Sequence, residues 1–443
     1  MAGADNIDAS LWRETWESTT VTFNGQTYSG YKPSGMLSNP DLKWETTISR
    51  NIGLDFGFFN NRLSGTIDAY WNTTKDLLMC IPIDETTGYS YQYQNIGQTS
   101  NKGIEIALNY DILRTKDFTL GVSATYNYNH NNIDELADNI IAQYGSQWAS
   151  SATTPTYDYE FREGKPVGLI RGYICDGYYT TADFNYDPAT KTYTLKPGVA
   201  DLGNQVGNYP SHYNLPEGQK AFPGAVKLRD LDGNGVADTE DVADLGEITH
   251  PHTGGFNLNM TWKDIDFSAG FAWAAGGRVY NVNSLINMYG NKDTGAGANK
   301  LEFISDCYQI YDIQNGELVP VVEPDALDAL NTGAKYGVPY MENGTVLSTF
   351  VEDASFLRLN TLTVGYTFPK AWTKKIGMQR ARVYATAGNL FTITGYSGID
   401  PEVNADPNKS TTAANTGNYP LLGMDYGTYP RARTFTFGVN ITF

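Results

Sequence analysis

The stretch DLDGNGVADTED, from residue 230 to residue 241, has the residue types and spacing best suited to bind a metal ion. Oxygen-bearing groups recur at the positions that a calcium loop uses, which here are the side chains of Asp230, Asp232, Asn234, Asp238 and Asp241 and the carbonyl of Val236. Gly235 supplies the sharp turn that such a loop needs at its sixth position. We therefore expect this stretch to bind one Ca²⁺.

Two features distinguish this stretch from a paired calcium sensor. Asp241 stands where such loops usually carry a bidentate glutamate, so its shorter side chain should weaken binding. No helix pattern flanks the stretch, which predicts a lone calcium loop within a surface segment. The alternative is a turn rich in Asp, Asn and Gly that is held by its own side-chain hydrogen bonds.

No other group of residues points to a catalytic or transition-metal site. The four histidines, at 130, 212, 250 and 252, include an HPH pair, but no third ligand lies at a sequence spacing typical of a metal site. The three cysteines are too scattered for a disulfide framework or a zinc site, and no nucleophile motif appears. A net charge of -18 argues against binding to nucleic acid, whose phosphates need Lys and Arg. These observations favour binding or transport over catalysis.

The segments that position these residues alternate between apolar and polar side chains. In the last nine residues, FTFGVNITF, the side chains of Phe435, Phe437, Val439 and Ile441 fall on one face, and Gly438 and Asn440 fall on the other. In water, an apolar strand of this kind at a sheet edge would promote aggregation. In a membrane barrel the apolar face meets lipid, and the polar face lines the lumen.

The same alternation predicts nine strands, arranged largely as hairpins, at 43–59, 62–77, 98–113, 117–131, 252–263, 265–280, 352–368, 379–395 and 429–443. A tenth, poorly patterned strand could lie within 11–32. Strands of ten or more residues favour a transmembrane antiparallel barrel over a soluble sandwich, whose strands are usually about five or six residues long. We therefore predict an all-β fold, with about nine or ten strands of a barrel.

Short turns between these strands alternate with long polar connections at 79–96, 131–251, 281–350 and 396–428. Outer-membrane barrels have short periplasmic turns and long extracellular loops, so the connections are expected outside the cell. The parity of the strands requires that 131–251 is an insertion with no net crossing. Loop aromatics, namely Tyr91, Tyr93, Trp148, Tyr157, Tyr178, Tyr179 and Tyr213, could stack on sugar rings, but packing within the loops is the simpler expectation.

Nine strands would close only a narrow barrel, and bacterial single-chain barrels have even strand numbers. The last strand is therefore expected to pair with an earlier strand outside this sequence. Within the sequence, it should either pair with residues near 11–58 in a small closed or distorted barrel or leave an open edge, and we favour the open or strained form.

The sequence resembles the C-terminal half of SusC/RagA-type TonB-dependent transporters, which are outer-membrane proteins of Bacteroidetes. The resemblance covers nearly all of 38–443 and includes NPDLKWETT, NIGQTSNKGIEIALNY, EGKPVGLIRGY, DLDGNGVADTEDVADLG, SFLRLNTLTVGYTFP and RVYATAGNLFTITGYSGIDPEV, in that order. It implies a large barrel around an N-terminal plug. No plug, TonB box or signal sequence is recognisable, so we expect the sequence to be a fragment. Residues 1–37, at its start, are expected to form a partial strand and a loop.

The resemblance also implies a function and partners. Members of this family import oligosaccharides or peptides with a SusD-like surface lipoprotein as a lid, driven through the TonB complex. By the same resemblance, Phe443 would sit at the periplasmic interface and act as the signature read during barrel assembly. The alternative from another class is a secreted, calcium-binding all-β protein that binds glycans.

Overall fold

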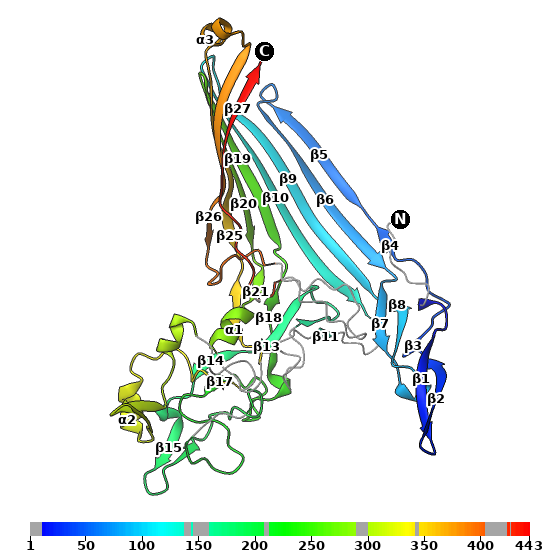
Figure 1. Cartoon of the computed structure of the whole chain (residues 1–443), viewed down its shortest axis with the longest axis vertical. Helices are drawn as coiled ribbons and strands as arrows, with labels where there is room; N and C mark the ends of the chain where they lie inside the picture. The colour runs from blue at the N-terminus through cyan, green and yellow to red at the C-terminus, as the bar shows by residue number, and fades with distance from the viewer. Residues whose placement is uncertain are drawn as a thin grey trace.

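A curved antiparallel sheet of ten strands dominates the computed structural model, which describes residues 11–136, 143–144, 159–207, 212–288, 300–341, 345–403, 423–425 and 427–443 (Figure 1). In spatial order its strands are β27 (Thr434–Thr442), β26 (Arg380–Thr394), β25 (Phe356–Thr367), β20 (Ile265–Ala275), β19 (His252–Trp262), β10 (Phe118–Glu135), β9 (Gln98–Arg114), β6 (Leu63–Lys75) and, both paired with β6, β4 (Thr46–Ile48) and β5 (Asn51–Phe58). We call it the main sheet.

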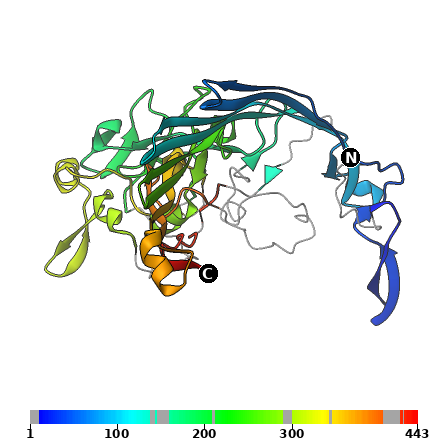
Figure 2. The ribbon, with the colours of Figure 1, turned by 90° about the horizontal axis from the view of Figure 1, so that it is seen from above.

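The main sheet does not close on itself. Among the described strands, β27 pairs only with β26, and β4 and β5 pair only with β6. Figure 2 shows the resulting arc from above, with the C-terminal strand and the blue N-terminal strands at opposite ends. The prediction of an all-β partial barrel with an open edge is confirmed.

All nine predicted strands lie in the main sheet, with the first divided into β4 and β5. The possible tenth barrel strand within 11–32 is not part of the main sheet. Instead of one barrel strand, β1 (Trp16–Phe23) and β2 (Gln26–Pro33) form a separate hairpin. Asn24 and Gly25 at its turn have φ angles of 49° and 76°, which suit a tight two-residue hairpin turn. The turn therefore pairs the two segments with each other.

The two faces of the main sheet differ in chemistry. One face, which we call the apolar face, exposes large hydrophobic side chains on every part of the arc, including Ile52, Leu54, Ile67, Trp71, Ile104, Leu108, Trp262, Val364, Val383, Ile393, Phe435, Phe437, Val439 and Ile441. Phe437, for example, is 81% exposed. The opposite, polar face carries mainly Gly, Asn, Ser, Thr and acidic residues. Such alternation on long strands is the pattern of a lipid-facing wall around a polar lumen.

At one end of the main sheet, the long connections pack into a single compact unit, which we call the loop domain. Its core joins residues from 131–251, Tyr280, residues from 281–350 and one residue, Met424, from 396–428. Its strands include β11 (Gln143–Tyr144), β12 (Tyr159–Glu160), β13 (Leu169–Tyr173), β14 (Cys175–Tyr178), β15 (Phe184–Asp187), β16 (Thr192–Leu195), β17 (Val226–Leu228), β18 (Val242–Glu247), β21 (Arg278–Tyr280), β22 (Tyr311–Gln314), β23 (Glu317–Pro320) and β24 (Val351–Asp353). The described strands inside 131–251 pair only with each other, as the parity argument required.

The remaining elements are small. A three-stranded sheet of β3 (Met36–Leu37), β7 (Leu78–Pro82) and β8 (Tyr91–Asn95) extends from the same end of the main sheet. Helices α1 (Val282–Met288) and α2 (Pro324–Leu330) belong to the loop domain, and α3 (Lys370–Thr373) lies in the short connection between β25 and β26. Among the described residues, no helix is both long enough and apolar enough to span a membrane.

Adjacent residues of β27 allow a direct test of the two faces. In the full-length protein, Phe437→Arg should lower the stability of the membrane-inserted state by about 2–4 kcal/mol, because it places a charge in lipid. Thr436→Arg places the same side chain on the polar face and should change stability much less. Denaturant titration in lipid vesicles would measure both. Equal losses for the two variants would contradict the assignment of the faces.

Candidate functional site

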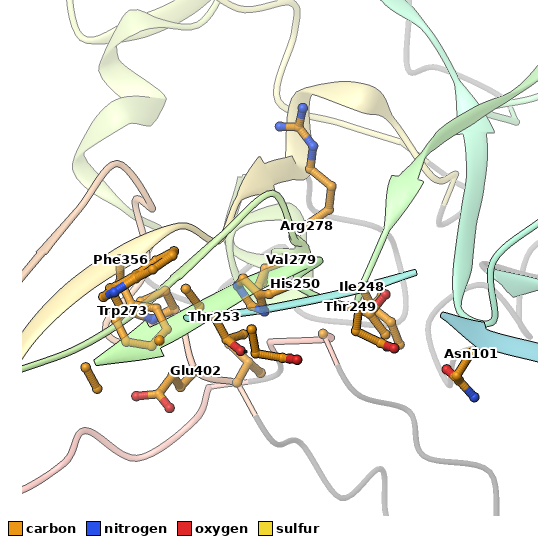
Figure 3. Close-up of a pocket in the computed structure, with 18 of the residues that line it drawn as sticks. Asn101, Ile248, Thr249, His250, Thr253, Trp273, Arg278, Val279, Phe356 and Glu402 are labelled. Atoms are coloured by element: carbon orange, nitrogen blue, oxygen red, sulfur yellow. Dashed lines mark hydrogen bonds between the residues drawn. The ribbon is translucent and has the colours of Figure 1, made fainter. Parts of the chain in front are cut away.

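A cavity of about 1040 Å³ lies where the polar face of the main sheet meets the loop domain (Figure 3). Strands β6, β9, β10, β19, β20, β21 and β25 line it. Residues 248–250 and 401–403, together with Gly423 and Arg431, contribute from the connections. Ligand pockets usually enclose about 300–1,000 Å³, so this cavity is at the upper end of that range.

Four asparagines from three neighbouring strands supply much of the polar lining: Asn72 on β6, Asn101 on β9, and Asn127 and Asn129 on β10. We call them the asparagine band. Asn72 and Asn101 are direct cross-strand partners, and Asn127 is opposite Thr253 of β19. Since cross-strand partners project from the same face about 5 Å apart, Asn72 and Asn101 place two amide groups side by side on the cavity wall, and Asn127 and Asn129 add two more on the same polar face.

The hydrogen bonds of the band leave part of its capacity unused. The Tyr70 hydroxyl donates to Asn129 Oδ1 over 2.9 Å, and Asn127 Nδ2 donates to Thr253 Oγ1 over 3.4 Å. Asn127 Oδ1 is buried and accepts no hydrogen bond from any described residue. A buried acceptor without a partner costs about 1–3 kcal/mol. A donor group of a ligand would recover that cost.

Gly103 allows Tyr70 to lie across the wall beside the band. The two residues are cross-strand partners, and a Cβ atom at position 103 would collide with the phenol ring of Tyr70. The glycine is therefore needed for a close approach of side chain and strand. It lets the Tyr70 ring form part of the cavity wall.

The side of the cavity next to the loop domain carries His250, Arg278 and Phe356. His250 Nε2 lies 3.1 Å from the Ala354 carbonyl and therefore donates to it, and the imidazole packs edge-on against the Phe356 ring. In Figure 3 the Arg278 guanidinium points away from the labelled Thr253 and Asn101. This side therefore offers mainly apolar and aromatic surface.

A network of four charged residues closes the end of the cavity. Arg358, on β25, is 1% exposed and binds Asp400 over 2.6 Å and Glu402 over 3.0 Å. Arg431 lies 3.8 Å from Asp400 and 3.2 Å from Glu402. The network pairs two cations with two anions, so its formal charge is zero. It holds the connection that follows β26 against the wall.

Neither this cavity nor this network was predicted from the sequence. The residues that form them come from six strands and several connections, so no local motif marks them. A weaker signal was present in β10, where Asn127 and Asn129 recur on the polar face that the alternation had already assigned to the lumen. Amides at that spacing could have indicated a polar ligand surface.

The predicted calcium loop lies between β17 and β18 of the loop domain, and its carboxylates converge. Carboxylate oxygens of Asp230, Asp232 and Asp241 all lie within 4.8 Å of one another. Asn234 Nδ2 donates to Asp232 over 3.1 Å and to Asp238 over 2.9 Å. Among the described ion pairs, none includes any of these four aspartates. Their negative charges therefore lack a neighbouring cationic side chain.

Backbone groups hold the loop in shape. Asp230 accepts hydrogen bonds from the N–H groups of Gly235 over 2.8 Å and Gly233 over 2.7 Å, which lower the pKa of its carboxyl group. Asp241 is fully buried and accepts from the N–H groups of Leu231 and Asp238. These contacts also fit the alternative of a self-bonded turn, so calcium binding stays a prediction.

Val236, the sixth predicted ligand, contributes to the loop through its backbone. Its N–H donates to Asn234 Oδ1 over 2.8 Å, and its backbone forms a parallel bridge with Asp201. The bridge includes hydrogen bonds from Asp201 N–H to the Gly235 carbonyl and from Ala237 N–H to the Asp201 carbonyl. The loop is thus fixed to the rest of the loop domain on both sides of Val236.

The other candidates from the sequence are dispersed. His212, His250 and His252 contact different partners, namely the Val321 carbonyl, the Ala354 carbonyl and the Tyr126 hydroxyl. Two of the loop aromatics, Tyr179 and Tyr213, are buried in the core of the loop domain, as the simpler expectation had it. Trp148 and Tyr157 lie outside the described residues.

Comparison with known proteins identifies the family. Residues 15–215 match a family model described as TonB dependent receptor-like, beta-barrel. The chain is 31% identical over 407 residues to TonB-dependent receptor P3 of Formosa agariphila, covering 92% of this chain and 35% of the relative. It is 29% identical over 429 residues to TonB-dependent receptor SusC of Bacteroides thetaiotaomicron, covering 96% and 34%. The chain thus spans about a third of the length of these relatives.

A solved structure, that of the RagAB peptide transporter, has a TM-score of 0.67 at 24% identity and covers 100% of this chain and 40% of that chain. The chain belongs to the SusC/RagA-type TonB-dependent receptors. This receptor is an outer-membrane β-barrel protein, as predicted. Its apolar face meets lipid, its polar face lines the lumen, and its long connections lie on the extracellular side.

The charge network gives a test of how the receptor's wall is held together. Arg358→Met should destabilise the full-length receptor by about 3–5 kcal/mol, because it leaves Asp400 and Glu402 with one arginine at longer range. Thermal unfolding in detergent and limited proteolysis of the connection after β26 would measure the effect. Arg433→Met, which removes an exposed arginine nearby, is the control. If both variants behave alike, the network has no structural role.

Proposed function

We propose that this chain forms part of the wall of an outer-membrane transporter that imports oligosaccharides or peptides. The observation that carries the proposal is the cavity on the polar, lumenal face, just below the extracellular loop domain. A ligand that enters the barrel from outside would meet this wall. The proposal is one of transport and not of catalysis, which agrees with relatives that are named as TonB-dependent receptors.

We further propose two protein partners. A SusD-like surface lipoprotein would cover the extracellular loop domain as a lid, in line with the resemblance to SusC. The TonB complex would supply energy through parts of the full-length protein that precede this chain in the family. The secreted, calcium-binding alternative is not retained, because a wall that exposes Phe437, Ile52 and Ile393 to its surroundings suits lipid and not water.

Uptake by whole cells tests the transport proposal. Cells that lack the genes for the full-length receptor and its paralogues should lose uptake of labelled oligosaccharides or peptides, because the route through the barrel is then absent. Dissipating the proton gradient of the wild type should have the same effect. The lipoprotein should co-purify with the wild-type receptor. Full uptake by the deletion strain, with the gene's paralogues also deleted, would contradict the proposal.

We also propose that Asp230, Asp232, Asn234, Asp238 and Asp241, with the Val236 carbonyl, bind one Ca²⁺ in the loop domain. The convergence of carboxylates without a cationic neighbour supports the proposal, since a divalent ion would relieve their repulsion. Asn234 would turn its amide so that Oδ1 and not Nδ2 faces the ion. The ion would then hold the segment between β17 and β18 in one conformation.

Isothermal calorimetry on the full-length receptor tests the metal. We expect binding of Ca²⁺ at millimolar concentration or below, and loss of that heat in Asp232→Ala. Asp187→Ala is the matched control, since Asp187 also accepts backbone hydrogen bonds in an exposed turn but lies outside the carboxylate cluster. Because the pKa of Asp230 is lowered, binding should persist at mildly acidic pH and fall only as that group becomes protonated. Absence of binding heat in the wild type would leave the self-bonded turn as the correct interpretation.

A further inference from the structure

The asparagine band presents both hydrogen-bond donors and acceptors that the protein does not use. Asn127 Oδ1 is buried without a partner among the described residues. The Asn101 side chain makes no hydrogen bond to any described residue, and Asn129 uses only its Oδ1 there. A primary amide combines an acceptor with two donors. Its complement is a ligand that both donates and accepts hydrogen bonds, as the hydroxyl groups of a sugar and the amide groups of a peptide do.

The charges around the cavity are already neutralised or directed elsewhere. Glu402 is paired with Arg431 and with the buried Arg358, and Arg431 also lies 3.8 Å from Asp400. His250 Nε2–H donates to the Ala354 carbonyl, and the Arg278 guanidinium points away from Thr253 and Asn101. An anionic ligand group that entered the band would lose water without gaining a counter-ion. The band therefore favours an uncharged ligand over an anionic one.

Two carboxylates further down the wall strengthen the selection against anions. Asp68 and Glu105 are direct cross-strand partners on the polar face, and Glu105 is in turn opposite Asn127. Neither has an ion-pair partner among the described residues. Two like charges in this position raise a negative potential next to the band. Uronate or sulfated ligands would be repelled there.

Aromatic surface borders the same region. The Tyr70 ring lies across Gly103 beside Asn129, and Phe356 lines the side next to the loop domain. A sugar ring has hydroxyl groups at its edge and C–H groups on its face. It could hydrogen-bond to the amides with its edge while its C–H face packs on an aromatic ring, a combination that extended peptides do not provide at every residue.

We propose that the asparagine band is a subsite for neutral oligosaccharides on the lumenal wall of the receptor. The inference rests on the proposed transport function and selects one of its two substrate classes. Asn101 and Asn127 bind hydroxyl groups of the ligand, and the Asn127 side chain turns on binding so that its Oδ1, buried in the unliganded wall, accepts one hydrogen bond. Asn129 is held in place by Tyr70 and offers its Nδ2 donors.

Equilibrium binding to the full-length receptor, purified in detergent, tests this subsite. The probes are neutral hexose oligosaccharides, uronate oligosaccharides, uncharged peptides and lysine-rich peptides. Neutral oligosaccharides should bind best. Asn101→Leu/Asn127→Leu, which removes the amides but keeps side-chain size, should weaken their binding about tenfold or more. Asn101→Leu alone, which leaves the Asn127 amide in place, should weaken it by a smaller factor.

Asn257→Leu is the matched control, because Asn257 lies on the same polar face, on β19, but outside the cavity. It should leave binding unchanged. Tighter binding of peptides or uronates, weakened by the double variant, would overturn the ligand class. Neutral-oligosaccharide binding that the double variant leaves intact would overturn the subsite, while transport would stand. If no probe binds and cells show no uptake, the transport proposal fails together with this one.

Discussion

The structure depends on one constraint: in lipid, every backbone N–H and C=O of a strand must find its partner on a neighbouring strand. The long ladders of the main sheet meet this requirement across the whole arc, from β5 and β6 to β26 and β27. Once the ladder is formed, its register decides which side chains face lipid and which face the lumen. Residues far apart in sequence, such as Asn72 and Asn101, become neighbours because of that register.

A single irregularity in the ladder determines where the charge network lies. The register of β25 shifts between Leu359 and Thr361, so that Asn360 is an extra residue opposite β20. Leu359 is opposite Phe271 on the apolar face, whereas Thr361 is opposite Gly270 on the polar face. Because a bulge reverses the alternation, Arg358 points inward beside the cavity. Without it, a buried arginine would face the membrane at a cost of several kcal/mol.

The strands and their facing could be predicted from the sequence, because period-two alternation over ten or more residues is a local signal. Even the bulge leaves a trace, since the apolar positions of SFLRLNTLTVGYTFP change from odd numbers at Leu357 and Leu359 to even numbers at Leu362 and beyond. The loop domain could not be predicted in this way. Its core joins residues as distant as Ile170, Tyr280 and Met424, and no periodic pattern relates them. The cavity could not be predicted for the same reason. The proposed calcium loop could be recognised in the sequence because its residues are consecutive.

Most buried acidic groups of this receptor are paired with cationic side chains or hydrogen-bond donors, which sets them apart from the loop in which we propose a Ca²⁺ site. Asp400 is paired with Arg358, and Glu160 is paired with Arg162 and Arg171. Asp425 accepts hydrogen bonds from the Tyr396 hydroxyl and from two backbone N–H groups.

Asp241 is also buried and accepts backbone hydrogen bonds, but further carboxylates, those of Asp230 and Asp232, approach it within 4.8 Å. Hydrogen bonds from N–H groups stabilise each carboxylate singly, yet they do not cancel the repulsion between carboxylates. At Asp400 and Glu402 that role falls to Arg358 and Arg431. In the loop between β17 and β18 no such side chain takes part, so a divalent cation is the simplest means of balancing the charge.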